Sequence, residues 1–359
     1  MLDSNKATTT ATNVGSVATN KLSDFLMRNW MRRSVVSWLA LPLAGLFWVL
    51  LCLRGLAYRL GWYEQTRLPV PVIVVGNIFV GGTGKTPFVL WLIEALKKAG
   101  CKPGVISRGY GGQLGAPRIV TFDAAAIDVG DEPLLLAQQG QCPVVIGRHR
   151  VAAGQFLLNA FPEVDVIISD DGLQHLALMR DLEIVLFDSR GVGNGWLLPA
   201  GPLREPVNRR RDFTVVNLGA DDVMNASFPA SVYRMQLMGT CAERLMDRKQ
   251  RQQLSQFDPS LGIIAAAGIG HPERFFTMLR KQGIQISVLP LPDHFGYAEN
   301  PFAHLTANII LITEKDAVKC RQVHAIATDP RIWVVAADVH MEAGLLEQIL
   351  EKLNGSTIT

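Results

Sequence analysis

The sequence is poor in cysteine and has no strong excess of charge of either sign. Only five of its 359 residues are cysteine, and no two of them form a C-x-x-C pair. We therefore expect neither a disulfide framework nor a cysteine-based zinc site, and a reducing compartment fits this composition. The formal net charge of +3 is too small to indicate nucleic acid, so we expect no nucleic-acid partner.

Composition and length limit the class of protein further. Hydrophobic residues make up 48% and charged residues 19% of the chain. This is too apolar for a disordered protein and too charged for a protein with many membrane spans. At about 100–200 residues per domain, the length predicts two domains. Residues 1–20 are rich in Thr, Asn, Ala and Ser without an apolar period, which predicts a disordered tail.

One long stretch, Val35–Leu53, carries no charge at all. As a helix it would span about 28 Å, close to the ~30 Å hydrocarbon core of a bilayer. A buried core helix, a single membrane span and an interfacial helix are the alternatives. Pro42 and Gly45 weaken a straight span, and arginines lie at both ends, which favours the interfacial helix. No small-residue cleavage site follows, so residues 21–62 are predicted to be a retained membrane-associating segment.

A phosphate-binding loop is predicted after this segment. The apolar run Pro71–Val75 has the pattern of a buried strand, and Phe88–Ala99 has that of a helix. Between them lies a glycine-rich loop ending in Gly-Lys-Thr, which is the context of a P-loop. The predicted nucleotide-binding residues are Phe79, Val80, Gly81, Gly82, Thr83, Gly84, Lys85 and Thr86. Phe79 stands where the usual P-loop pattern has its first glycine.

A metal site is predicted beside this loop. Val164–Ile168 has the pattern of a second buried strand, and Asp170 and Asp171 follow it. An acid at the carboxyl end of a strand next to a P-loop is where Mg²⁺ is held, together with the hydroxyl of Thr86. An ordinary Asp-Asp-Gly turn is the alternative for the two acids.

The remaining pattern alternates strands and helices. Short apolar runs at 105–106, 143–146, 183–187 and 214–217 predict further strands, with helices between several of them. The fold class is therefore α/β, with a P-loop NTPase-like, doubly wound, mostly parallel sheet in residues 63–220. Residues 221–359 are predicted to form a second, smaller α/β domain without its own P-loop.

Two further groups of residues suggest a phosphoryl acceptor. An Asp–His pair across a domain cleft, such as Asp131 and His294, could take a proton from an attacking hydroxyl. Helix capping by Asp131 and an interdomain hydrogen bond by His294 are the alternatives. The segment 193–205 mixes aromatic residues and glycines with Arg204, and Arg209, Arg210 and Arg211 follow it; such an arginine cluster beside apolar residues could bind a lipid phosphate. A solvated run of charge is the favoured alternative for these three arginines.

Together these motifs resemble the tetraacyldisaccharide 4'-kinase (lipid A 4'-kinase) family. The resemblance covers nearly everything from about residue 25 onward, and the stretches after Asp170 and around Arg204 are its most specific parts. In chain order the motifs are Gly81–Pro87, Ser107–Gly111, Gly130–Pro133, Asp170–His175, Ala200–Glu205, Ala267–Gly270, Asp293–His294 and Thr313–Lys319.

The resemblance implies transfer of the γ-phosphate of ATP to the 4'-hydroxyl of a tetraacyldisaccharide 1-phosphate. It implies Asp131 and His294 as the catalytic pair, and Mg²⁺ held by Asp170 and Asp171 with Glu132 nearby. Charge and location suggest substrate contacts by Arg204, Gln174, His175 and Arg150. The implied partners are the lipid substrate and the membrane surface, at the cytoplasmic face of the bacterial inner membrane, with no obligate protein partner.

Two other functions share the P-loop. One is a membrane-tethered ATPase or GTPase switch that acts on a protein, and the other is a nucleotide-sensing adaptor without a general base. Thr313–Asp316 does not support guanine specificity, because its lysine is one place too late for the Asn-Lys-x-Asp motif. Phosphoryl transfer to lipid would separate the kinase from both alternatives.

Overall fold

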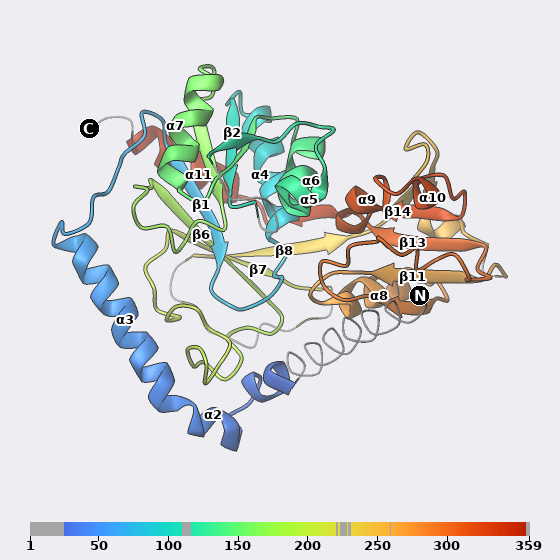
Figure 1. The fold of residues 1–359 in the computed structure, drawn as a ribbon, viewed down its shortest axis with the longest axis horizontal. Helices are drawn as coiled ribbons and strands as arrows, with labels where there is room; N and C mark the ends of the chain where they lie inside the picture. The colour runs from blue at the N-terminus through green and yellow to red at the C-terminus, as the bar shows by residue number, and fades with distance from the viewer. Residues whose placement is uncertain are drawn as a thin grey trace, which may run out of the picture.

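The computed structural model describes residues 25–109, 116–219, 222, 228, 231–258 and 260–356. The predicted tail at 1–20 lies outside this part. So do Tyr110 and Gly111, the last two residues of the motif Ser107–Gly111. Two sheets, one of nine strands and one of six, organise the chain (Figure 1). The predicted α/β class is confirmed.

The larger sheet is parallel except at its two edges. Its central strand β1 (Val72–Asn77) is buried along its whole length, as expected for a strand covered on both faces. The other strands, in order across the sheet around β1, are β15 (Asp338–Met341), β8 (Val232–Met238), β7 (Phe213–Asn217) and β6 (Leu182–Asp188) on one side, then β5 (Val166–Asp170), β2 (Pro103–Ser107), β4 (Val144–Ile146) and β3 (Arg118–Ile119) on the other. Only β3 and β15 pair antiparallel with their neighbours.

Helices cover both faces of this sheet. Side chains of α4 (Lys85–Lys98), α6 (Asp131–Gly140) and α11 (Leu345–Ser356) share one apolar core with the sheet. Side chains of α7 (Arg150–Ala160) belong to the core on the opposite face. A short helix, α5 (Ala126–Val129), precedes α6. The sheet is therefore doubly wound, as predicted, and its carboxyl edge receives the loops after β1, β2 and β5.

The smaller sheet has a parallel centre and an antiparallel side. Its strand order is β10 (Arg251–Gln253), β9 (Cys241–Arg244), β14 (Ile332–Val335), β13 (Ile309–Thr313), β11 (Ile263–Ala267) and β12 (Ser287–Pro290). Its helices are η1 (Leu254–Gln256), α8 (Pro272–Lys281), α9 (Glu314–Cys320) and α10 (His324–Ala327). The domain boundary near residue 220 stays a prediction: β8, β15 and α11 follow it in sequence and join the larger sheet.

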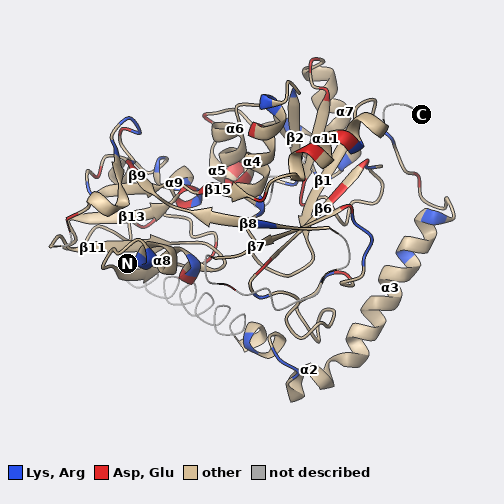
Figure 2. Cartoon of the chain, turned by 180° about the vertical axis from the view of Figure 1, so that it is seen from behind, with Lys and Arg blue, Asp and Glu red and all other residues tan. Residues whose placement is uncertain are grey.

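The uncharged N-terminal stretch forms two helices rather than one. Ser34 caps α2 (Val35–Leu39), and α3 (Leu41–Arg59) begins with Pro42 in its first turn, where proline is tolerated. By length and composition α3 could cross a membrane, and only 11% of its most apolar window is buried. This exposure excludes the buried core helix. Figures 1 and 2 show α3 apart from both sheets, and Figure 2 shows it uncharged along most of its length, with basic residues at one end.

The N-terminal segment is nevertheless attached to the body of the protein. The indole N–H of Trp30 donates to the carbonyl of Pro199 at 2.9 Å, and the amide of Asn194 donates to the carbonyl of Trp30 at 2.8 Å. Arg54 of α3 donates to the carbonyl of Gln174 at 2.8 Å. The apolar helices are therefore fixed next to the loops that follow β5 and β6.

Candidate active site

The loop between β1 and α4 has the backbone of a phosphate-binding loop. Gly81 and Gly84 have φ values of 100° and 93°, a region that favours glycine. A Cβ atom at Gly84 would lie 2.4 Å from the side-chain nitrogen of Asn217, so no larger residue fits there. The loop ends at Lys85, the first residue of α4, and so directs the positive end of that helix toward the loop.

Asn77, the last residue of β1, organises this loop, and the sequence analysis missed it. Its side-chain nitrogen donates to the carbonyls of Phe79 (2.6 Å) and Gly81 (2.9 Å), and its oxygen accepts from Lys85 Nζ at 3.0 Å. The only available signal was its place at the end of a strand directly before the glycines. Phe79 is buried, and the guanidinium of Arg190 lies 4.4 Å from its ring centre, so this departure from the usual glycine is accommodated by packing.

The two acids at the end of β5, Asp170 in the strand and Asp171 directly after it, have different surroundings. Asp171 Oδ1 accepts from Lys85 Nζ at 2.9 Å, and its other oxygen lies 3.6 Å from Arg204. Asp170 is buried, and one of its oxygens accepts from the Ser107 hydroxyl at 3.1 Å. Burial, reinforced by the charge of Glu132, raises the pKa of Asp170 to about 6. Lys85 and Arg204 outweigh the burial of Asp171 and lower its pKa.

The second oxygen of Asp170 is the observation that bears on Mg²⁺. This Oδ1 atom is buried without a hydrogen-bond partner. An unpartnered carboxylate oxygen in a site that already penalises negative charge fits a divalent cation. Within the described residues, no three His, Cys, Asp or Glu side chains converge on one point. Mg²⁺ does not need such a cage, because it takes one or two carboxylates with water and substrate phosphates.

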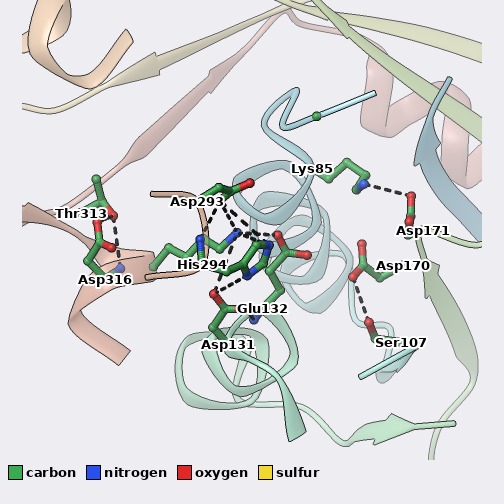
Figure 3. A network of polar contacts seen from close by, with 12 residues as sticks. Lys85, Ser107, Asp131, Glu132, Asp170, Asp171, Asp293, His294, Thr313 and Asp316 are labelled. Atoms are coloured by element: carbon green, nitrogen blue, oxygen red, sulfur yellow. Dashed lines mark hydrogen bonds and ion pairs between the residues drawn. The ribbon is translucent and has the colours of Figure 1, made fainter. Parts of the chain in front are cut away.

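Asp131 and His294 are brought together from the two sheets. Asp131 begins α6, and His294 lies in the loop after β12; the distance from Nδ1 of His294 to Oδ2 of Asp131 is 3.0 Å (Figure 3). The hydrogen bond to Asp131 raises the pKa of His294. Burial acts to raise the pKa of Asp131, but the bond with His294 and two nearby lysines outweigh it and lower that pKa. His294 has a φ of 58°, an uncommon conformation for a residue other than glycine.

The two lysines are Lys315 and Lys319 of α9, and neither was predicted as a site residue. Lys319 Nζ lies 3.3 Å from Asp131 Oδ2, and Lys315 Nζ lies 3.0 Å from Glu132 Oε1 and 3.4 Å from His294 Nε2. Asp316 between them is buried and accepts from the amide of Gly268. The sequence feature that could have indicated these lysines is the stretch Thr313–Lys319, which follows a predicted strand. In the structure this stretch places two cations beside the acids of α6 and does not form a guanine-binding motif.

The four predicted substrate contacts lie around the loop after Asp171. Gln174 donates to Glu205 at 2.7 Å. Burial is the main cause that lowers the pKa of His175 to about 4, and the nearby cations Arg150, Arg108 and Arg54 lower it further. Arg150 is only 2% exposed and donates to the carbonyls of Gly147 and Asp170. Its guanidinium therefore faces protein carbonyls, which favours a role in positioning Asp170 over direct contact with substrate.

Comparisons with known proteins show the family of this chain. A family model described as tetraacyldisaccharide-1-P 4'-kinase matches residues 36–354. The chain belongs to this family. Among its relatives are tetraacyldisaccharide 4'-kinases from Janthinobacterium sp. (strain Marseille), 55% identical over 94% of this chain and 98% of that one, and from Herminiimonas arsenicoxydans, 56% identical over 94% and 97%. The family resemblance stated from the sequence is confirmed.

A solved structure is similar across the same range. The kinase LpxK from Aquifex aeolicus, crystallised in complex with ATP, superposes with a TM-score of 0.73. It is 30% identical, and the match covers 90% of this chain and all of that one. The tetraacyldisaccharide 4'-kinase family and its fold therefore account for both sheets described above.

Proposed function

We propose that this chain transfers the γ-phosphate of ATP to the 4'-hydroxyl of a tetraacyldisaccharide 1-phosphate, a step of lipid A biosynthesis. The single observation that carries the proposal is the 3.0 Å contact between His294 and Asp131 beside a P-loop in a chain of this family. A nucleotide switch or adaptor needs no such pair, because it has no hydroxyl to deprotonate. The ATP-bound relative supports ATP as the phosphoryl donor.

In this proposal His294 takes the proton of the 4'-hydroxyl through Nε2, the ring nitrogen that does not face Asp131, and the hydroxyl replaces Lys315 Nζ, which lies 3.4 Å from that nitrogen. Asp131 holds the ring by its contact with Nδ1 and stabilises the imidazolium that forms. Lys315 and Lys319 hold the acids of α6 in place through their contacts with Glu132 and Asp131. Positioning and charge neutralisation supply most of the rate in phosphoryl transfer, so the base accounts for only part of it.

The phosphate groups would be bound by the loop from Phe79 to Gly84, by Lys85 and by Thr86. Mg²⁺ bound at this site would supply neutralisation of the phosphate charge. Asp170 is proposed as its direct carboxylate ligand, because its Oδ1 has no other partner. Asp171 and Glu132 are proposed to act from a greater distance, since Lys85 and Lys315 already engage them.

The lipid would approach from the side of the N-terminal helices. Arg204, Gln174 and His175 lie in the loops to which these helices are attached, and we propose that they contact the lipid headgroup. We further propose that α3 binds the cytoplasmic face of the inner membrane, with the lipid and the membrane surface as the partners. The exposed apolar side chains of α3 and its basic end support this placement.

The proposed reaction is tested by incubating the purified enzyme with ATP, Mg²⁺ and tetraacyldisaccharide 1-phosphate. The expected product is lipid that gains one phosphoryl group by mass spectrometry for each ATP consumed. Lys85→Ala should lose ATP binding and product together, because the lysine lies in the P-loop beside Asp171. ATP hydrolysis with unchanged lipid would favour the switch ATPase instead.

The membrane placement predicts an effect of three leucines of α3. Leu43, Leu46 and Leu50 are 60%, 57% and 56% exposed. Since burying a leucine contributes about 1.5–3 kcal/mol, each change to serine should lower partitioning into liposomes by about tenfold or more. Changing the same three residues to methionine is the matched control. Equal liposome binding by both triple variants, measured by flotation, would remove α3 as the membrane contact.

A further inference from the structure

Two side chains donate hydrogen bonds to backbone carbonyl groups of the P-loop. Arg190 Nη2 donates to the carbonyl of Gly82 at 2.8 Å, and Asn217 Nδ2 donates to the carbonyl of Thr83 at 3.1 Å. Because the peptide unit is planar, fixing these two carbonyls also fixes the direction of the N–H groups of Thr83 and Gly84. Those N–H groups belong to the stretch expected to surround the phosphates.

A single side chain from the smaller sheet's layer, Arg274, contacts Asn217 directly and reaches Arg190 through Asp188. Arg274 Nη2 donates to the carbonyl of Asn217 at 2.8 Å, and its Nη1 lies 3.5 Å from Asp188 Oδ2. Asp188 is buried and accepts from Arg190 at 2.7 Å. Two short routes therefore run from Arg274 to the P-loop, one through Asp188 and Arg190 and the other through Asn217.

Arg274 belongs to the layer of the smaller sheet. It lies in the first turn of α8, and the next two residues, Phe275 and Phe276, are buried in the core between α8 and that sheet. The preceding loop also approaches the P-loop closely. A Cβ atom at Gly270 would lie 3.4 Å from the amide nitrogen of Gly82 and 3.1 Å from Asp293, the neighbour of His294.

We propose that Arg274 is a positioning residue that fixes the P-loop in its ATP-binding geometry from the smaller sheet. It does so through Asp188 and Arg190 on one side and Asn217 on the other. The layer that carries His294 thereby sets the shape of the loop that binds ATP. The inference rests on the proposed function for the identity of the nucleotide.

The test compares Arg274→Gln with Arg280→Gln in the full chain. Arg280 is on the same helix, but it is 46% exposed and pairs with Glu273 on the surface. Titration with a non-hydrolysable ATP analogue should give about a tenfold weaker Kd for Arg274→Gln and no change for the control. The KM for ATP should rise by a similar factor, with the KM for the lipid unchanged.

A second variant and a double-mutant cycle keep the test decisive. Arg274→Lys keeps the charge beside Asp188 but lacks the paired nitrogens of the guanidinium, so its Kd should fall between those of wild type and Arg274→Gln. Combined with Asn217→Ser, Arg274→Gln should weaken binding by less than the product of the single effects, since both act on the carbonyl of Thr83.

An unchanged Kd for Arg274→Gln together with a lowered melting temperature would overturn the inference, because a merely structural arginine affects stability without affecting the nucleotide. Additive effects in the cycle would also contradict it. Weakened ATP binding by Arg274→Gln in an enzyme that leaves the lipid unphosphorylated would support the inference while removing the proposed function.

Discussion

A His294→Asn variant should bind ATP as wild type does but transfer phosphate about 10²–10⁴-fold more slowly. Asparagine can still bond to Asp131, but it cannot accept a proton at neutral pH. Because His294 lies in a loop after β12 and outside the P-loop, the nucleotide contacts should remain. The measurements are kcat for lipid phosphorylation at saturating substrates and the Kd of an ATP analogue.

His304→Asn is the matched control, since this exposed histidine follows ten residues later and should leave kcat unchanged. Asp131→Asn should lower kcat as well, and the double variant should be little worse than either single variant, because the two residues act as a unit. Fully additive losses would mean that the 3.0 Å contact is structural and that the two residues act separately.

The second large effect is expected for Asp170. Asp170→Asn should raise the Mg²⁺ concentration needed for half-maximal activity by about 10–100-fold, on the scale of other losses at metal sites. The neutral amide removes the charge of the unpartnered Oδ1, which is the atom best placed for a cation. Activity is measured against Mg²⁺ at a fixed concentration of ATP.

Asp165→Asn provides the comparison at the opposite end of β5. Asp165 is exposed and accepts from the amide of Lys102 at 2.7 Å, away from the carboxyl edge of the sheet. The Asp165→Asn variant should leave the Mg²⁺ dependence of the activity unchanged. If Asp171→Asn shifted that dependence while Asp170→Asn did not, the assignment of the two acids would have to be exchanged.

Local patterns predicted much of the fold and part of the site. The apolar run at β1, the glycines and the helix after Lys85 adjoin one another in sequence, so the P-loop follows from neighbouring residues alone. The same holds for β5 and the two acids at its end. The pairing of Asp131 with His294 was one of several alternatives until the family resemblance favoured it, because residues 163 positions apart leave no local signal.

The features that the sequence did not reveal depend on distant partners or on irregular structure. Lys319 lies on a short helix and contacts an acid 188 residues earlier. Strand β15 has only four residues, of which Asp338 and His340 are exposed, and its place at the edge of the larger sheet depends on pairing with β8. Asn77 and Arg190 support the P-loop by contacts that no spacing rule contains.

For the N-terminal segment, composition alone predicted the exposure of the helix but not its attachment to the rest of the protein. The absence of charge predicted a helix exposed to lipid, and the exposure of α3 agrees with that expectation. The break between α2 and α3 was only suggested by Pro42, which begins the second helix. The attachment through Trp30 could not be predicted, because its acceptor Pro199 is 169 residues away.

The most direct test of the account is the fate of labelled γ-phosphate. Enzyme purified in detergent is incubated with γ-labelled ATP, Mg²⁺ and tetraacyldisaccharide 1-phosphate, beside an Asp131→Ala variant, and the lipid is separated by thin-layer chromatography. We expect label in the lipid at the 4' position with wild type and almost none with the variant. Label released only as free phosphate, or equal labelling by the variant, would contradict the account.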